Sequence, residues 1–109
     1  MMRRPLLSFL LATILCGVQH ASADTFPNRK VSIVVPALTG TSDVLARAMA
    51  QRLALALGQP VVVDNKPGAG GAIGADLVAK AAPDGLTIGI SALATHAINP
   101  WLYNKMPFD

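Results

Sequence analysis

Three short apolar runs alternate with two longer segments whose apolar residues recur at helical spacing. The runs span Lys30–Pro36, Val61–Asp64 and Leu86–Ser91, and they contain many of the β-branched residues that favour strands. The first run is apolar at nearly every position, which is typical of a strand in a parallel sheet covered on both faces. Pro36 ends this strand because proline has no N–H to donate.

The first segment of helical spacing predicts a helix that runs to about Leu57. Thr41 or Ser42 can cap its N-terminus, and Asp43 then lies in the first turn, where free N–H groups and the helix dipole favour a carboxylate. Gly58 ends the helix, since glycine readily adopts the left-handed conformation that follows a helix. The residues at helical spacing are Val44, Leu45, Ala48, Met49, Arg52, Leu53 and Ala56.

A second helix is predicted from Ala72 to Ala82, ahead of the turn-forming residues 83–85. The order of strand, helix, strand, helix, strand with short connections indicates an α/β fold with a doubly wound, mostly parallel sheet. In such sheets, ligands bind at the carboxyl ends of the strands. Three loops are expected there, at residues 37–42, 65–71 and 91–99.

The loop at 65–71 has two interpretations. Gly68, Gly70 and Gly71 leave backbone N–H groups unshielded ahead of a helix, which makes an anion site for phosphate or carboxylate. Alternatively, these glycines build only a tight turn between a strand and a helix. The dinucleotide fingerprint G-x-G-x-x-G is not matched, because Gly74 comes one residue late, and the Gly-Lys-Ser/Thr of a P-loop is absent.

Enzyme chemistry and metal binding have little support in residues 24–109. His96 is the only histidine there, and a Ser/His/Asp site would have to recruit Ser91 and a distant aspartate without the spacing of a nucleophile elbow. One histidine, no cysteine and scattered aspartates do not form a metal-ligand cluster. We therefore expect no enzymatic activity, no metal and no cofactor.

Charged residues of the first helix also have two interpretations each. By the favoured interpretation, Asp43 accepts hydrogen bonds from free N–H groups at the start of the helix. The alternative is that Asp43 contacts a ligand. Arg47 and Arg52 either are solvated or cover an apolar surface with their side chains. Alternatively, they bind the carboxylate of a substrate.

Residues 1–23 have the three parts of a secretory signal peptide. Two arginines come first, an apolar run covers Leu6–Val18, and Ala21-Ser22-Ala23 precedes the expected cleavage site. The apolar run has 13 residues, fewer than the ~20 that a membrane-spanning helix needs. We therefore expect export and cleavage after Ala23 rather than a stable membrane anchor.

Removal of the signal peptide changes the composition of the chain. It takes the only cysteine, Cys16, which follows Leu15 rather than the small residue of a lipoprotein processing site. It also takes two of the nine Lys and Arg residues, so that seven remain against six aspartates and the net charge falls from +3 to +1. Without a basic cluster, nucleic-acid binding has little support. The remaining 86 residues are enough for one small domain without a disulfide.

Six stretches occur in the mature chain in an order that is specific when taken together. They are Val34-Val35-Pro36 with Asp43-Val44-Leu45-Ala46-Arg47, Leu57-Gly58-Gln59-Pro60-Val61-Val62-Val63, Asn65-Lys66-Pro67-Gly68-Ala69-Gly70-Gly71, Ala79-Lys80-Ala81-Ala82-Pro83-Asp84-Gly85, Thr95-His96-Ala97-Ile98-Asn99-Pro100 and Met106-Pro107-Phe108-Asp109. Through them the chain resembles the Bug/TctC family, the extracytoplasmic solute-binding receptors of tripartite tricarboxylate transporters.

The resemblance implies a periplasmic, two-lobed, hinged protein that closes on a small carboxylate and passes it to the membrane permease of a tripartite transporter. Residues 24–109 would form the N-terminal part of lobe one. In that family, backbone N–H groups and ordered water from the loops after the first strands hold the carboxylate. Carried over by position, the candidate ligand-binding residues are Gly40, Thr41, Ser42 and Asp43 in the first loop, Gly68, Ala69, Gly70 and Gly71 in the second, and Ser91, Thr95 and His96 in the third.

The chain departs from the family pattern at two places. The loop at 37–42 is shorter and has one glycine where the family usually has a pair, and the chain stops at Asp109, well short of the family's usual length. A clamp needs two lobes, so truncation is expected to impair solute binding. Two alternatives are a non-functional fragment with open edge strands and, less favoured, a dinucleotide-binding enzyme domain built on the strand, glycine loop and helix.

Overall fold

A three-stranded parallel sheet forms the centre of the computed structural model, which describes residues 25–108. The strands are β1 (Val31–Val35), β2 (Val61–Asn65) and β3 (Thr87–Gly89), in the spatial order β2-β1-β3. In the middle strand, Ile33 is in register with Val63 of β2 and with Ile88 of β3. The predicted α/β fold with a parallel sheet is confirmed. The predicted signal peptide and its cleavage site lie outside the described residues.

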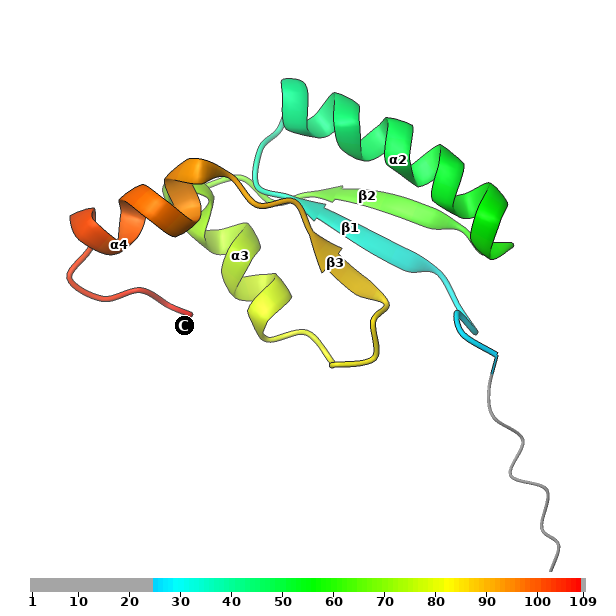
Figure 1. Cartoon of the computed structure of the whole chain (residues 1–109). Coiled ribbons are helices and arrows are strands. Elements are labelled where there is room, and N and C mark those ends of the chain that lie inside the picture. Colours follow the sequence, from blue (N-terminus) through cyan, green and yellow to red (C-terminus); the bar gives the residue numbers. More distant parts are fainter. Residues whose placement is uncertain (1–24, 109) are drawn as a thin grey trace, which may run out of the picture.

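Two helices cover opposite faces of this sheet, α2 (Thr41–Leu57) and α3 (Ala72–Ala79). The short 3-10 turn η1 (Ala69–Gly71) precedes α3, and the π-helical turn η2 (Ala94–Ile98) and α4 (Asn99–Leu102) follow β3 and lie beyond the end of the sheet (Figure 1). Because β2 and β3 pair with opposite edges of β1, right-handed crossovers place α2 on one face and α3 on the other, as Figure 1 shows. The sheet is therefore doubly wound, as the order of elements predicts.

The core lies between β1 and α2. Ile33 and Val35 are 1% and 0% exposed, and they pack against Ala46 and Ala50 of the helix. Alanines at the contact let the helix lie close to the sheet. This orientation leaves Val44 67% exposed, although its helical spacing matches that of the other apolar positions. The stripe that faces inward is therefore the one that packs against β1, and helical spacing alone does not identify it.

The prediction that Thr41 or Ser42 caps α2 is wrong. Gly40 is the N-cap residue, no side chain caps the helix, and the Gly40 carbonyl accepts a bond from the Val44 N–H at 3.1 Å. Gly40 has a φ of 107°, a backbone conformation that residues with a side chain rarely adopt. It therefore takes the cap position itself, and the helix begins at Thr41. The predicted end of the helix is confirmed, since Gly58 is left-handed with φ of 65° and its N–H donates to the Ala54 carbonyl.

Helix α3 and strand β3 are both shorter than predicted. The helix ends at Ala79 rather than Ala82, because the Ala81 N–H bonds to the Val78 carbonyl at 3.1 Å and tightens the turn before Pro83. Paired strand residues cover Thr87–Gly89 rather than 86–91.

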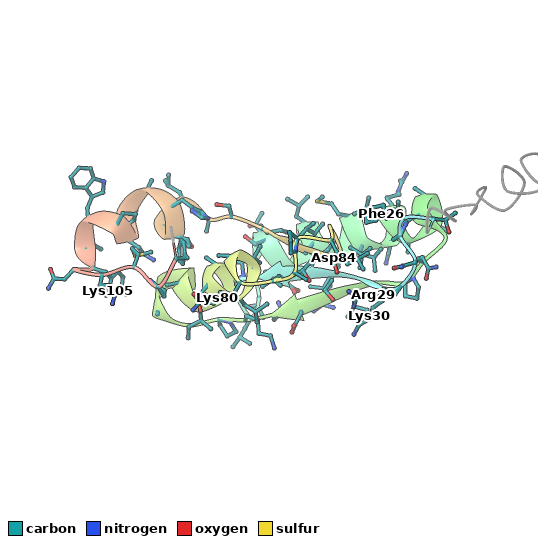
Figure 2. The ribbon with its side chains drawn as sticks, turned by 90° about the horizontal axis from the view of Figure 1, so that it is seen from below. Phe26, Arg29, Lys30, Lys80, Asp84 and Lys105 are labelled. Atoms are coloured by element: carbon teal, nitrogen blue, oxygen red, sulfur yellow. The ribbon has the colours of Figure 1, made fainter. Side chains whose placement is uncertain are left out.

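A charged contact joins the N-terminal segment to the turn before β3. Arg29 Nη2 lies 2.6 Å from Asp84 Oδ2, and Asp84 Oδ1 accepts the Leu86 N–H at 3.0 Å. The Leu86 N–H contributes most to lowering the pKa of Asp84 below its ordinary value, and Arg29 contributes less. Figure 2 shows Phe26, Arg29 and Asp84 at one end of the molecule, far from Lys105. This end holds the amino ends of the strands and is remote from the candidate site.

Candidate ligand site

The carboxyl ends of the three strands lie at one edge of the sheet, where the chain leaves toward helices on opposite faces. The Lys66 N–H bonds to the Val35 carbonyl at 2.8 Å, and the Ile90 N–H bonds to the Val34 carbonyl at 2.9 Å. These bonds extend the pairing by one residue and hold the starts of the second and third loops beside the end of β1. In a sheet of order β2-β1-β3, the crossovers diverge between β1 and β3, and ligands bind at such a switch point.

Asn65, the last residue of β2, joins the first loop to the second. Its side-chain Nδ2 donates to the Ala37 carbonyl at 2.7 Å and to Asp43 Oδ1 at 2.8 Å. Its Oδ1 accepts from Arg47 Nη2 at 3.3 Å. One partly buried amide therefore fixes both the loop after β1 and the first turn of α2.

Asp43 forms a bidentate ion pair with Arg47, which lies one turn further along α2. Arg47 Nε lies 2.9 Å from Asp43 Oδ2, and Arg47 Nη2 lies 3.0 Å from Asp43 Oδ1. The hydrogen bonds from Arg47 and, second, from Asn65 lower the pKa of Asp43, while partial burial acts in the opposite direction. The same pair raises the pKa of Arg47 above its ordinary value. The Asp43 side chain is only 14% exposed, so its charge is compensated within the protein.

The second loop is a left-handed turn. Ala69, Gly70 and Gly71 have φ of 47°, 61° and 89°, and the Gly71 N–H bonds to the Gly68 carbonyl at 2.9 Å. Among the described residues, neither the Ala69 N–H nor the Gly70 N–H donates a hydrogen bond to another backbone group. Two successive N–H groups are therefore available to an anion, as the anion interpretation of the sequence requires.

Close packing also requires the glycines of this loop. A Cβ at Gly70 would lie 3.0 Å from Asn99 Nδ2, and one at Gly71 would overlap Thr95 Oγ1. A Cβ at Gly74 would lie 3.1 Å from the Lys66 carbonyl oxygen. The tight-turn interpretation is thus supported alongside the anion interpretation, because the two demands fall on the same residues.

The segment after β3 contacts the second loop through two buried side chains that donate hydrogen bonds. Thr95 Oγ1 donates to the Gly70 carbonyl at 3.2 Å, and Asn99 Nδ2 donates to the same oxygen at 3.0 Å. Thr95 is 1% exposed and Asn99 is 4% exposed. Ser91 and His96 are exposed, and the His96 ring meets Phe108 edge-on with centroids 5.7 Å apart.

A largely apolar cavity of about 190 Å³ adjoins these residues on the α3 face of the sheet. Val34, Val78 and Ile90 line it, together with the polar residues Ser91, Thr95 and His96. Among residues 25–108, no group of histidine, cysteine and carboxylate side chains is placed to hold a metal ion. Over the same residues, no helix is long and apolar enough to cross a membrane.

The structure brings most of the candidate residues to one edge of the sheet but gives them different surroundings. The start of α2 holds Gly40, Thr41, Ser42 and Asp43, whereas the loop of Gly68–Gly71 lies against Thr95. Neither Asn65 nor Asn99 is among the candidate residues predicted from the sequence. Asn65 directly follows the predicted strand Val61–Asp64, and Asn99 directly precedes Pro100. These positions are the only indications of a role that the sequence contains. Arg47 pairs with Asp43, and Arg52 borders a shallow apolar surface of α2 instead.

Residues 45–109 match the family model described as "Tripartite tricarboxylate transporter family receptor". A UPF0065 protein of Bordetella pertussis is 41% identical over 101 residues, which is 90% of this chain and 31% of that protein. "Protein BugT" of the same organism is 53% identical over 72 residues, which is 65% of this chain and 22% of that protein. The chain therefore spans about a third of the length of the first of these relatives, and less of the second.

Two solved structures resemble the fold at similar identity. "R. palustris Rpa4515 with adipate" has a TM-score of 0.73 and 44% identity, covering 77% of this chain and 28% of that one. "MatC (Rpa3494) from Rhodopseudomonas palustris with bound malate" has a TM-score of 0.69 and 43% identity, covering 74% and 28%. Each of these relatives is seen with a small dicarboxylate, adipate in the first and malate in the second.

Proposed function

We propose that this chain, which belongs to the tripartite tricarboxylate transporter receptor family, forms part of a periplasmic receptor that binds a small dicarboxylate. Membership confirms the resemblance seen in the sequence, and the family is one of receptors rather than enzymes. The observation that carries the proposal is the left-handed turn at the carboxyl edge of the sheet, where the Ala69 and Gly70 N–H groups donate to no other backbone group among the described residues.

The charge arrangement at this edge supports an anionic ligand. Asp43 is the only carboxylate among the candidate residues, and Arg47 and Asn65 donate to its oxygens. A ligand carboxylate at the second loop therefore meets backbone N–H groups rather than an uncompensated negative charge. Hydrogen bonds from N–H groups to a carboxylate are charge-assisted and stronger than neutral ones.

The binding is proposed to be weak in this chain alone. The described loops contact a ligand from one side, whereas the relatives with bound malate and adipate are more than three times as long as the part matched here. An affinity near 1 mM corresponds to about 4 kcal/mol, which a few charge-assisted hydrogen bonds can supply. Residues 24–109 are then the first part of lobe one, and a membrane permease is the proposed recipient of the ligand.

The proposed location follows from the first 23 residues. Their apolar run and Ala21-Ser22-Ala23 fit a signal peptide cleaved after Ala23, and export to the periplasm agrees with the family. N-terminal sequencing of the chain recovered from a periplasmic fraction tests this part, and Asp24 is the expected first residue. A chain that keeps Met1 would contradict it.

Isothermal titration calorimetry against malate and adipate tests the carboxylate proposal, with NAD as the control for the dinucleotide alternative. The same titration on a version extended with the second lobe of a relative tests whether affinity rises when both sides of the ligand are contacted. We expect weak heats with dicarboxylates, stronger binding by the extended version and none with NAD. Absence of dicarboxylate binding in both versions would refute the proposal. Binding of NAD without binding of either dicarboxylate would also refute it.

A further inference from the structure

Two buried side chains converge on a single backbone oxygen in the second loop. Asn99 Nδ2 and Thr95 Oγ1 donate to the Gly70 carbonyl at 3.0 and 3.2 Å, from positions 29 and 25 residues further along the chain. Neither donor is open to solvent, since Asn99 is 4% and Thr95 is 1% exposed. Buried polar side chains are retained when their hydrogen bonds are satisfied, and here both serve the same acceptor.

The shared acceptor determines the orientation of the loop. The Gly70 carbonyl and the Gly71 N–H belong to one peptide unit, so fixing the carbonyl also fixes the N–H, which donates to the Gly68 carbonyl at 2.9 Å. The peptide unit is thereby held at both ends. The Ala69 and Gly70 N–H groups lie immediately before it and take their direction from it.

The packing leaves little room for another arrangement. A Cβ at Gly70 would lie 3.0 Å from Asn99 Nδ2, and a Cβ at Gly71 would overlap Thr95 Oγ1 and lie 3.2 Å from Pro36 Cβ. The loop therefore lies directly against its two donors. Glycine has more conformational freedom in the backbone than any other residue, so contacts with neighbours must supply the order that the loop shows.

We propose that Asn99 and Thr95 are positioning residues for carboxylate binding, and that they act through the Gly70 carbonyl without contacting the ligand. The inference rests on the proposed function. Their hydrogen bonds preorganise the N–H groups of Ala69 and Gly70, so that binding does not have to order a glycine-rich loop. Preorganisation of this kind raises affinity by lowering the entropy lost on binding.

Two near-isosteric variants of the 109-residue chain test the proposal. Thr95→Val removes the hydroxyl donor, and Asn99→Leu removes the amide donor without adding a charge. We expect each to weaken malate binding about tenfold in an NMR titration, and to shift the Gly70 and Gly71 amide resonances before any ligand is added. Thr95→Ser keeps the hydroxyl and is expected to restore affinity to within about twofold of the original chain.

A matched control separates positioning from a general loss of stability. Ile33→Val truncates a core residue that lies in β1, and is expected to lower stability without changing malate affinity. Equal loss of affinity in Ile33→Val and Thr95→Val would overturn the inference, as would unchanged binding in both Thr95→Val and Asn99→Leu. If Asn99→Leu fails to fold by circular dichroism, the comparison of Thr95→Val with Thr95→Ser decides the question. Absence of malate and adipate binding in both the original chain and its two-lobed extension would refute the proposed function itself, whereas binding that is insensitive to these variants would refute only the positioning role.

Discussion

The Asn65 amide donates to the Asp43 carboxylate across 2.8 Å, although 22 residues separate them in the sequence. Since Asn65 ends β2 and Asp43 lies in the first turn of α2, this bond ties the end of the second strand to the start of the first helix. The same amide holds the Ala37 carbonyl at 2.7 Å. The first loop therefore takes its shape from a residue of the next strand.

Replacing Asp43 by asparagine is expected to lower stability in a pH-dependent manner. Arg47 and Asn65 hold the pKa of Asp43 below its ordinary value of about 3.9, so ionised Asp43 contributes stability above that pH. The contribution disappears as the pH falls through the lowered pKa of the folded state. Urea unfolding of the original chain and of Asp43→Asn measures the difference at each pH.

The difference between these two proteins should be largest at about pH 6 and should shrink toward about pH 2. Asp84 also has a lowered pKa, but it is present in both proteins and cancels in the comparison. A difference that stays constant from about pH 6 to about pH 2 would contradict the assigned role of the Asp43 charge.

Gly71→Ala is expected to destabilise the fold more than Gly58→Ala. Both glycines have positive φ, 89° and 65°, which costs an alanine about 1 to 2 kcal/mol. A Cβ at Gly58 meets no atom within 4 Å, whereas one at Gly71 overlaps Thr95 Oγ1. Overpacking adds about 1 to 3 kcal/mol to the cost at Gly71. Equal free energies of unfolding for the two variants would show that the loop can move away from Thr95.

The core side of the sheet is expected to be more sensitive than its other face. Ile33 is 1% exposed and packs toward α2, so Ile33→Val should cost about 1 kcal/mol. Val62 is 44% exposed, and Val62→Ala should cost less despite removing more atoms. Thermal or urea unfolding of the two variants provides the comparison. A larger loss for Val62→Ala would mean that the face of β2 remote from α2 is covered in solution.

The main elements could be predicted from the sequence because local rules govern them. A run of β-branched residues before Pro36 is β1, and Gly58 ends α2 in the left-handed conformation. The buried stripe of α2 could not be predicted, because the helix has apolar residues on several sides. The sheet selects Ala46 and Ala50 for their small size, which depends on the distance between two elements rather than on spacing.

The candidate site was predictable in its place but not in its internal contacts. Strand order places the loops at one edge, and the glycines identify the loop at 65–71 as unusual. No local pattern indicates that Asn99 reaches Gly70 from 29 residues away. This contact depends on how the segment after β3 packs against η1, which only the folded chain determines. The ion pair of Arg47 with Asp43, in contrast, lies within α2 at the i,i+4 spacing that favours such pairs, and the sequence does contain that local signal.

The most direct test of carboxylate binding at this edge is an NMR titration of the nitrogen-labelled chain with malate. We expect saturable shifts of the Ala69 and Gly70 amide resonances, because these N–H groups donate to no other backbone group among the described residues. The Gly85 amide, in the turn before β3 at the opposite edge, should remain in place. Unmoved Ala69 and Gly70 resonances, or shifts confined to the Gly85 edge, would contradict the account.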